Sequence, residues 1–331
     1  MDALPGATIR SGVDRAVLAD AVIRLRTSRL VAMPTETVYG LAASTVDPEA
    51  VRRIYSAKER PADNPLIAHV SSVEMAKSLC RSWPDAAAVL ARACWPGPLA
   101  MVLDRDDSVP AIAAGGRDSI AVRMPAHPVA LHLIESFGGP VSAPSANRSG
   151  SISPTEARHV LGDFADEDLL ILDGGPCRIG LESTVVDLRS ETPVILRPGA
   201  VTADRIAGLL GRPVENPFVE GQADAPGTAS KHYSPTTPTR LCTLEESGGP
   251  ETAVITIAAT PSSFPYPATG VRFRVDLPDD PDLVGALLYS TLHAADLSGA
   301  DRIDIVPPSA AHQSSDWNAV LDRLQRAAAT D

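Results

Sequence analysis

Apolar residues up to position 210 follow two alternating patterns. In one, they recur every three or four positions, which predicts amphipathic helices; in the other, short unbroken runs end at Gly or Pro, which predicts buried strands. Helices are predicted at residues 14–26, 48–57, 73–79, 85–93, 128–136 and 203–210, and strands at 30–33, 66–70, 99–103, 119–123, 141–143, 169–172, 183–188 and 194–196. This alternation predicts an α/β domain built on an open, twisted mixed sheet with flanking helices.

Residues 211–238 interrupt the alternation, because they are rich in Pro, Gly, Ser and Thr. A smaller α/β pattern follows, with strands predicted at 253–257 and 302–306 and helices at 283–297 and 316–328. We therefore expect a first domain over residues 10–212, a linker over 213–238 and a small C-terminal α/β domain over 239–331.

Charge narrows the classes of partner. The chain has 29 Lys and Arg against 41 Asp and Glu, a formal charge of −12, so it offers no overall positive field for nucleic acid or an anionic membrane. No apolar run reaches the roughly 20 residues that a membrane helix needs, and the first residues do not resemble an export signal. We expect a cytoplasmic protein with no membrane partner and no direct binding of tRNA.

The cysteines and the familiar motifs exclude further classes. The four cysteines are far apart and form no CxxC pair, which predicts buried thiols instead of a disulfide framework or a zinc site. The sequence also has no GxxxxGK[ST], GxGxxG, HExxH or GxSxG motif. A standard P-loop, Rossmann, zincin or α/β-hydrolase site is therefore not expected.

Small polar and basic residues gather in the segments next to several predicted strands. PTETVYGL occupies 34–41, two cations and an amide lie within 58–64, and SAPSANRSG occupies 142–150. Cations fixed in a loop suit a phosphate or a carboxylate. Each segment also has a purely structural reading: 34–38 as a helix start, Lys58 and Arg60 as complements to a helix dipole, and 142–150 as a turn-rich loop.

Together these segments resemble the threonylcarbamoyl-AMP synthase family, whose catalytic unit is the YrdC-type domain. The resemblance covers about residues 10–212 in the expected order: PTETVYGL at 34–41, KxRxxxNPL at 58–66, WPGPL at 95–99, AVRMPAHP at 121–128, SAPSANRSG at 142–150, ESTVVD at 182–187 and LRPG at 196–199. The linker resembles the longer two-domain form, but it reads PGTASKHY at 226–233 where PGMKYRHY is expected. The His-Tyr end is kept, and Pro226-Gly227-Thr228 departs from the family pattern.

The resemblance implies a nucleotidyltransferase reaction. L-threonine, bicarbonate or CO2, and ATP would form L-threonylcarbamoyladenylate and pyrophosphate, and the product would feed a downstream tRNA threonylcarbamoyl-transferase complex. Such a reaction depends on positioning and charge neutralisation. The resemblance also implies Mg2+ brought with ATP, and no protein metal site is expected.

Site residues are carried over from the matching motifs. Lys58, Arg60, Ser145 and Asn147 would be catalytic; ATP would contact the residues Arg60, Asn64, Ser119, Ser145, Asn147, Ser153, Arg197, His232 and Tyr233. Threonine would contact Thr35, Thr37, His69, Arg123, Ala143 and Ser183, with Arg123 pairing the substrate carboxylate. A core histidine and a structural ion pair are the alternatives for His69 and Arg123.

Two other functions stay open from sequence alone. YrdC-type domains have also been described as binding double-stranded RNA, which would need a local basic surface. A related carbamoyl-transfer enzyme is the second alternative, although the extra zinc-binding and acylphosphatase-like segments of such enzymes have no counterpart here.

Overall fold

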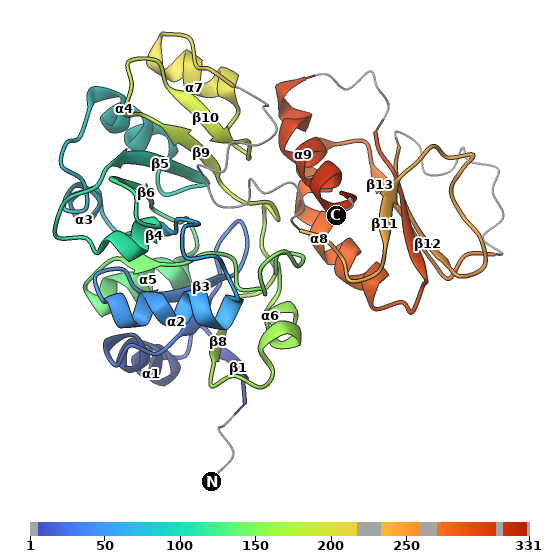
Figure 1. The fold of residues 1–331 in the computed structure, drawn as a ribbon, viewed down its shortest axis with the longest axis horizontal. Coiled ribbons are helices and arrows are strands. Elements are labelled where there is room, and N and C mark those ends of the chain that lie inside the picture. Colours follow the sequence, from blue (N-terminus) through green and yellow to red (C-terminus); the bar gives the residue numbers. More distant parts are fainter. Residues whose placement is uncertain (1–5, 217–232, 259–269, 309–313, 330–331) are drawn as a thin grey trace.

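The computed structural model describes residues 6–216, 233–258, 270–308 and 314–329. Two sheets organise this part of the chain (Figure 1). The large sheet has the order β1-β8-β2-β3-β7-β4-β6-β5-β9-β10. Its strands are β1 (Thr8–Ser11), β2 (Val31–Met33), β3 (Gly40–Ser44), β4 (Ile67–His69), β5 (Leu99–Asp104), β6 (Ser119–Arg123), β7 (Val141–Ser142), β8 (Leu170–Asp173), β9 (Thr184–Asp187) and β10 (Val194–Arg197).

The large sheet is mixed. Its parallel pairs are β1–β8, β2–β8, β4–β6 and β5–β9, and its antiparallel pairs are β2–β3, β3–β7, β4–β7, β5–β6 and β9–β10. Its helices are α1 (Arg15–Arg26), α2 (Pro48–Lys58), α3 (Val73–Lys77), α4 (Asp85–Cys94), α5 (Pro128–Phe137), α6 (Ala157–Phe164) and α7 (Ala203–Leu210). The predicted α/β class with a mixed sheet and flanking helices is confirmed.

Alternation along the strands separates the two faces of the sheet. In β5, Met101 and Leu103 pack into the apolar core that α2, α3, α4 and α7 share, whereas Ala100 and Val102 join a second cluster on the opposite face. Ile67 of β4 and Ala121 of β6 also belong to that second cluster. Side chains two positions apart on a strand share a face. His69 and Arg123, which follow Ile67 and Ala121 by two positions, therefore point to the same face as that second cluster.

Helix ends follow the local sequence. Asp47 caps α2, since its carboxylate accepts a hydrogen bond from the backbone N–H of Glu49 at 2.9 Å, and Pro48 occupies the first turn. The helix ends where Glu59 adopts a left-handed conformation, with φ 53°. Lys58, placed in a loop by the sequence pattern, is therefore the last residue of α2, which fixes the direction of its side chain.

The segment after β2 does not begin a helix, so that structural reading of residues 34–38 is wrong. The Thr35 hydroxyl accepts hydrogen bonds from the backbone N–H groups of Thr37 and Val38, and the chain then turns directly into β3. A threonine that bonds the backbone two and three residues on stabilises a tight turn. The turn keeps the polar side chains of this segment next to the ends of the strands.

The second sheet is small and entirely parallel, with the order β11-β14-β12-β13. Its strands are β11 (Thr239–Leu241), β12 (Thr252–Ala258), β13 (Phe273–Pro278) and β14 (Arg302–Val306), and its helices are α8 (Pro281–Asp296) and α9 (Asn318–Ala327). The predicted small α/β fold is thus present. Much of the predicted linker at 213–238 lies outside the described residues, so the domain bounds stay a prediction.

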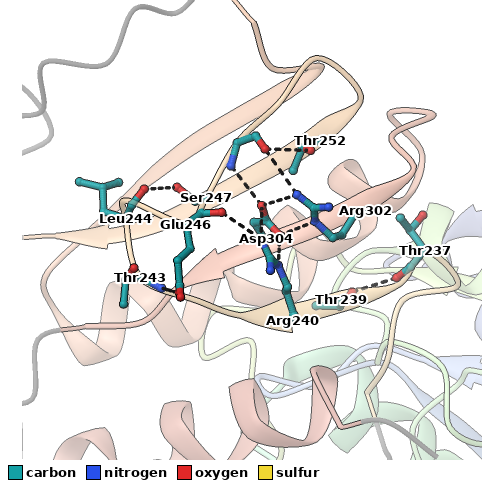
Figure 2. Close-up of polar contacts among 11 residues, drawn as sticks. Thr237, Thr239, Arg240, Thr243, Leu244, Glu246, Ser247, Thr252, Arg302 and Asp304 are labelled. Atoms are coloured by element: carbon teal, nitrogen blue, oxygen red, sulfur yellow. Dashed lines mark hydrogen bonds and ion pairs between the residues drawn. The ribbon is translucent and has the colours of Figure 1, made fainter.

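A buried carboxylate organises the edge of the small sheet. Asp304 in β14 is fully buried and pairs with Arg240 and Arg302, both at 2.7 Å, and it also accepts the backbone N–H of Gly248 (Figure 2). Burial alone would raise the pKa of Asp304, but the two guanidinium groups and the Gly248 N–H hold it below its usual value. The Asp304 carboxylate therefore joins β11 and β14 to the loop before β12.

The two sheets share a continuous core. Val38, Ile152 and Leu181 from the large-sheet part of the chain pack in the same apolar cluster as the buried faces of α8 and α9. Gly180 has a φ of 75°, and a Cβ on it would lie 2.4 Å from the carbonyl oxygen of Gly285 in α8. Only glycine fits such an approach, so the two parts are closely packed.

None of the described helices is long and apolar enough to cross a membrane.

The core predicts a contrast within α1. Leu25 is 1% exposed and packs under the large sheet, whereas Ile23 on the same helix is 58% exposed. Leu25→Ala should lower the free energy of unfolding by about 2–5 kcal/mol, because it leaves a cavity. Ile23→Ala should change it by about 0.5 kcal/mol or less. Urea unfolding of both variants tests this, and equal losses would contradict the packing described here.

Candidate active site

One pocket opens on the sheet face opposite α2, α3, α4 and α7, where the ends of several strands meet. The residues that line it are Thr35, Thr37, Val38, Gly40, Arg60, Ile67, His69, Arg123, Ala143, Pro144, Ser145, Glu182, Ser183, Arg197 and Tyr233. Segments far apart in the chain therefore converge on one cavity.

The strand register explains this convergence. β4 and β6 are parallel with His69 opposite Arg123, and both side chains follow by two positions residues that face the same side of the sheet. Arg197 in β10 pairs with Val185 of β9, which also belongs to that face. Carboxyl ends of neighbouring parallel strands lie together, so His69 and Arg123 enter the pocket side by side.

All of the residues predicted to contact threonine line this pocket: Thr35, Thr37, His69, Arg123, Ala143 and Ser183. Arg60, Ser145, Arg197 and Tyr233 from the predicted ATP set line it as well. Lys58, Asn64, Ser119, Asn147 and Ser153 are not among the lining residues, and His232 lies outside the described residues. Their roles stay predictions, and the contacts below show where the described ones lie.

Arg123 forms a buried ion pair with Glu36. The Nη2 group of Arg123 lies 2.6 Å from the carboxylate of Glu36, and its Nε donates to the carbonyl of Gly97 at 3.2 Å. Burial would raise the pKa of Glu36, but Arg123 and backbone donors lower it below its usual value. Arg123 is thus in a structural ion pair and also lines the pocket, and its pairing with the substrate carboxylate stays a prediction.

His69 is neutral in this environment. Burial, together with the nearby Arg123, lowers its pKa to about 3. Its Nδ1 lies 3.2 Å from the carbonyl oxygen of Ile67, which can only accept a hydrogen bond, so Nδ1 carries the proton. The other ring nitrogen, Nε2, is then an acceptor for a hydroxyl or an ammonium group in the pocket.

Lys58 holds the loop after β7. Its side chain is 1% exposed, and Nζ donates to the backbone carbonyls of Ser145 and Asn147, at 2.5 Å each. A compact ammonium fits between two carbonyls where a planar guanidinium would not. Burial lowers the pKa of Lys58 well below its usual value. Lys58 thus binds a loop far from α2 in the sequence, which the helix-dipole reading does not require.

Asn147 completes the same loop. Its amide nitrogen donates to the carbonyls of Arg148 and Ser151, both at 2.8 Å, while its Oδ1 is buried without a hydrogen-bond partner in the described part of the chain. A buried, unsatisfied carbonyl oxygen is unfavourable. The atom is therefore suited to accept a hydrogen bond from a ligand or water next to Ser145.

Arg60 is oriented by Asn64. The guanidinium of Arg60 donates to the Asn64 side-chain oxygen at 2.5 Å, to the Asn64 carbonyl at 3.2 Å and to the Pro65 carbonyl at 3.1 Å. Burial lowers the pKa of Arg60 to about 10, so it keeps its charge at neutral pH. Asn64 thus positions a cation that lines the pocket instead of lining it itself.

Arg197 lines the pocket next to Ser183. It donates to the Ser183 carbonyl at 3.1 and 2.9 Å and approaches the Ser183 hydroxyl at 3.3 Å. Gly199 allows these two segments to meet, because a Cβ there would lie 2.3 Å from the backbone nitrogen of Thr184. The Ser153 hydroxyl donates to Glu182 at 2.6 Å.

Ser119 lies farthest from this constellation. It begins β6, four residues before Arg123, which is about 13 Å along a strand at the usual rise. It pairs across the sheet with Asp104 at the end of β5. The structure therefore does not bring Ser119 together with the pocket.

Comparison with known proteins identifies the family. A profile described as "Telomere recombination" matches residues 24–199, and one described as "Threonylcarbamoyl-AMP synthase, C-terminal domain" matches residues 201–329. A threonylcarbamoyl-AMP synthase of Bacillus subtilis is 35% identical over 94% of this chain and 92% of its own length. The chain belongs to the threonylcarbamoyl-AMP synthase family.

Two further similarities extend along the chain. The threonylcarbamoyl-AMP synthase of Pyrococcus abyssi is 50% identical over 64% of this chain, and the match spans 63% of that relative. The crystal structure of P. abyssi Sua5 complexed with L-threonine superposes with a TM-score of 0.83 at 35% identity, covering 97% of this chain and 96% of the other. The predicted family, its two-domain form and an adenylate-forming transferase activity are confirmed.

Sequence reasoning missed Glu36 and Glu182. Glu182 lines the pocket and pairs with Arg323, whereas Glu36 does not line it but pairs with Arg123, which does. A signal existed for each: an acid between two threonines in PTETVYGL, and an acid directly before the serine of ESTVVD. A carboxylate next to polar residues at a strand end is a candidate partner for a buried arginine.

The environment of His69 predicts a flat titration. Because burial lowers its pKa to about 3, the ring should stay neutral from pH 5.5 to 8.5. The imidazole resonances of His69, assigned by comparison with His69→Gln, should not shift over this range in NMR spectra. A step near the ordinary histidine value of about 6.5 would contradict the buried geometry.

Proposed function

We propose that this pocket is the active site of an L-threonylcarbamoyladenylate synthase that uses L-threonine, bicarbonate or CO2, and MgATP. The carrying observation is that every residue predicted to contact threonine lines one pocket, together with Arg60, Ser145 and Arg197. The likeness to P. abyssi Sua5, which was crystallised with L-threonine, supports the same substrate. The product would serve the threonylcarbamoyladenosine modification of tRNA.

The reaction forms two bonds. The threonine amine nitrogen bonds to the carbon of CO2 and loses a proton, giving a carbamate; from bicarbonate, water leaves as well. A carbamate oxygen then bonds to the α-phosphorus of ATP as the bond to the pyrophosphate oxygen breaks. The protein has little covalent chemistry to do here, so its contribution is orientation and charge stabilisation.

The threonine side of the pocket recognises an amino acid. In the described residues, Nη1 of Arg123 has no hydrogen-bond partner, since Nε and Nη2 are bound to Gly97 and Glu36. We assign this group to the substrate carboxylate, with Glu36 holding the guanidinium in place. Neutral His69 would accept from the substrate, and the Thr35 and Thr37 hydroxyls would face it.

The nucleotide side is assigned to Arg60, Arg197 and the loop at Ser145. The guanidinium groups of Arg60 and Arg197 would neutralise phosphate oxygens. Lys58 would hold the loop with Ser145 and Asn147 next to the bound nucleotide. Tyr233 lines the same wall, while the matching role proposed for His232 falls outside the described residues.

Mg2+ is proposed as part of the substrate MgATP. Within the described ranges, no group of three His, Cys, Asp or Glu side chains is arranged to hold a metal ion. We expect the phosphates to be the main ligands, as is usual for Mg2+ at nucleotide sites.

The other two functions have less support. Binding of double-stranded RNA would need an exposed basic surface, whereas the cations of this site are buried around a small cavity. An enzyme with a different carbamoyl acceptor would not require the hydroxyls of Thr35 and Thr37 in this pocket. Delivery of the product to a tRNA threonylcarbamoyl-transferase complex in the cytoplasm, without direct tRNA binding by this chain, remains our proposal.

Pyrophosphate release tests the function directly. With MgATP present, release should require both L-threonine and bicarbonate, and omission of either should reduce it to the background rate. Chelation of Mg2+ should have the same effect. Release that is indifferent to threonine would refute the proposal, and formation of the adenylate can be followed separately by mass spectrometry.

A substitution of Lys58 tests the nucleotide side. Lys58→Met keeps much of the side-chain volume but removes two hydrogen bonds, each worth about 0.5–1.5 kcal/mol, so kcat/KM for ATP should fall about 5- to 150-fold. Lys77→Met, at the exposed end of α3, is the matched control and should stay within about twofold. Equal activity of the two variants would exclude Lys58 from the site.

A further inference from the structure

Helix α9 sends one arginine into the large-sheet part of the chain. Arg323 is 0% exposed, and its Nε donates to the carboxylate of Glu182 at 2.9 Å. Its Nη2 donates to the carbonyl of Pro198 at 3.0 Å, and its guanidinium lies 5.2 Å from the centre of the Tyr233 ring. One side chain therefore contacts three segments that border the pocket.

Glu182 is the centre of this arrangement. One carboxylate oxygen accepts from Ser153 at 2.6 Å, and the other accepts from Arg323 and from the Tyr289 hydroxyl of α8, at 3.0 Å. Glu182 itself lines the pocket. Both of its oxygens are thus bound, and two of the three donors come from the small-sheet part of the chain.

The charges in this cluster compensate one another. Burial would raise the pKa of Glu182, but Arg323, Arg197 and the Ser153 hydroxyl hold it at about 2, so it is ionised at neutral pH. Arg323 also donates to Asp322 at 2.5 Å, and Asp322 in turn accepts from Arg326 at 2.8 Å. Removal of one partner would leave a buried charge unpaired, which is strongly unfavourable.

The contacts of Arg323 are adjacent to predicted substrate contacts. Glu182 precedes Ser183, and Pro198 follows Arg197, so the guanidinium holds the two segments from which these side chains project. Arg197 also donates to Ser183 directly. A shift of Arg323 would therefore be transmitted to Ser183 and Arg197 through covalently adjacent residues.

We propose that Arg323 is a positioning residue for the reaction: it acts through Glu182 and Pro198 to hold Ser183 and Arg197 in the pocket. The small-sheet part of the chain then completes the active site from behind, without touching the substrates. The inference rests on the proposed function, because its readout is synthesis of the adenylate.

The test compares two arginines of α9. Arg323→Met should lower kcat/KM for ATP about tenfold or more, whereas Arg326→Met, which removes another partner of Asp322, should stay within about threefold. Folding is checked by far-UV circular dichroism and by fluorescence of Trp317, which is buried beside α9. A folded Arg323→Met variant with wild-type kinetics would overturn the inference.

A double-mutant cycle separates positioning from a general structural role. If Arg323 acts through Glu182, Arg323→Met should cost less than about threefold in a Glu182→Gln background, far below its cost alone. If the fold-losses in kcat/KM of the two single variants multiply in the double variant, transmission through Glu182 is contradicted. A destabilised but otherwise intact fold would lower activity in both backgrounds alike.

A conservative variant covers the case in which Arg323→Met does not fold. Arg323→Lys keeps the charge beside Glu182 but cannot also donate in a fixed fork to Pro198, so kcat/KM should fall about threefold or more. Unchanged kinetics in this variant would overturn the inference. If the wild-type chain itself released no pyrophosphate with threonine and bicarbonate, the proposed function would fail instead, independently of Arg323.

Discussion

The pocket depends on basic side chains that are buried and yet have hydrogen-bond partners. Arg123 forms an ion pair with Glu36, and Arg60 donates hydrogen bonds to the side chain and the carbonyl of Asn64. Lys58 donates to two backbone carbonyls. A buried charge is tolerated only when a partner replaces the water it has lost. Asn64 lies in the same loop as Arg60, but the partners of Arg123 and Lys58 lie almost ninety positions away, so those contacts also fix how the segments meet.

This constraint explains why the site lies where strand ends converge. The sheet itself needs only apolar faces, which the buried apolar residues of β3 to β6 supply, while the loops beyond the strands supply carbonyls and hydroxyls. Preorganised dipoles and charges of this kind stabilise an anionic transition state without rearranging during the reaction. The same groups that satisfy the fold are thus the groups that can act on a nucleotide and an amino acid.

Much of this could be predicted from the sequence. Periodicity located most helices and central strands within a few residues, and the motifs indicated side chains that do line one pocket. The missed elements are short or weakly patterned: GLAAS of β3 has no β-branched residue, and the three-residue β11 carries Arg240, whose partner Asp304 lies 64 positions away. Local sequence cannot indicate such elements, because packing against neighbours decides them.

The partners of the buried charges were harder to predict than the charges themselves. Lys58 was singled out, but the loop that it holds lies almost ninety positions away, and nothing near Glu182 in the chain indicates an arginine in α9. Such pairs follow from the topology of the whole sheet. Motif spacing contains no information on them, since it describes neighbours along the chain only.

The separation between Arg323 and its partners also has a consequence during synthesis. Arg323 follows Pro198 by 125 residues and Glu182 by 141. At the usual 5–20 residues per second, a ribosome needs roughly 7 to 28 seconds to translate the 141 residues that follow Glu182. For that time the large sheet can form on the nascent chain while the carboxylate of Glu182 still lacks its guanidinium, so the back wall of the pocket is assembled last.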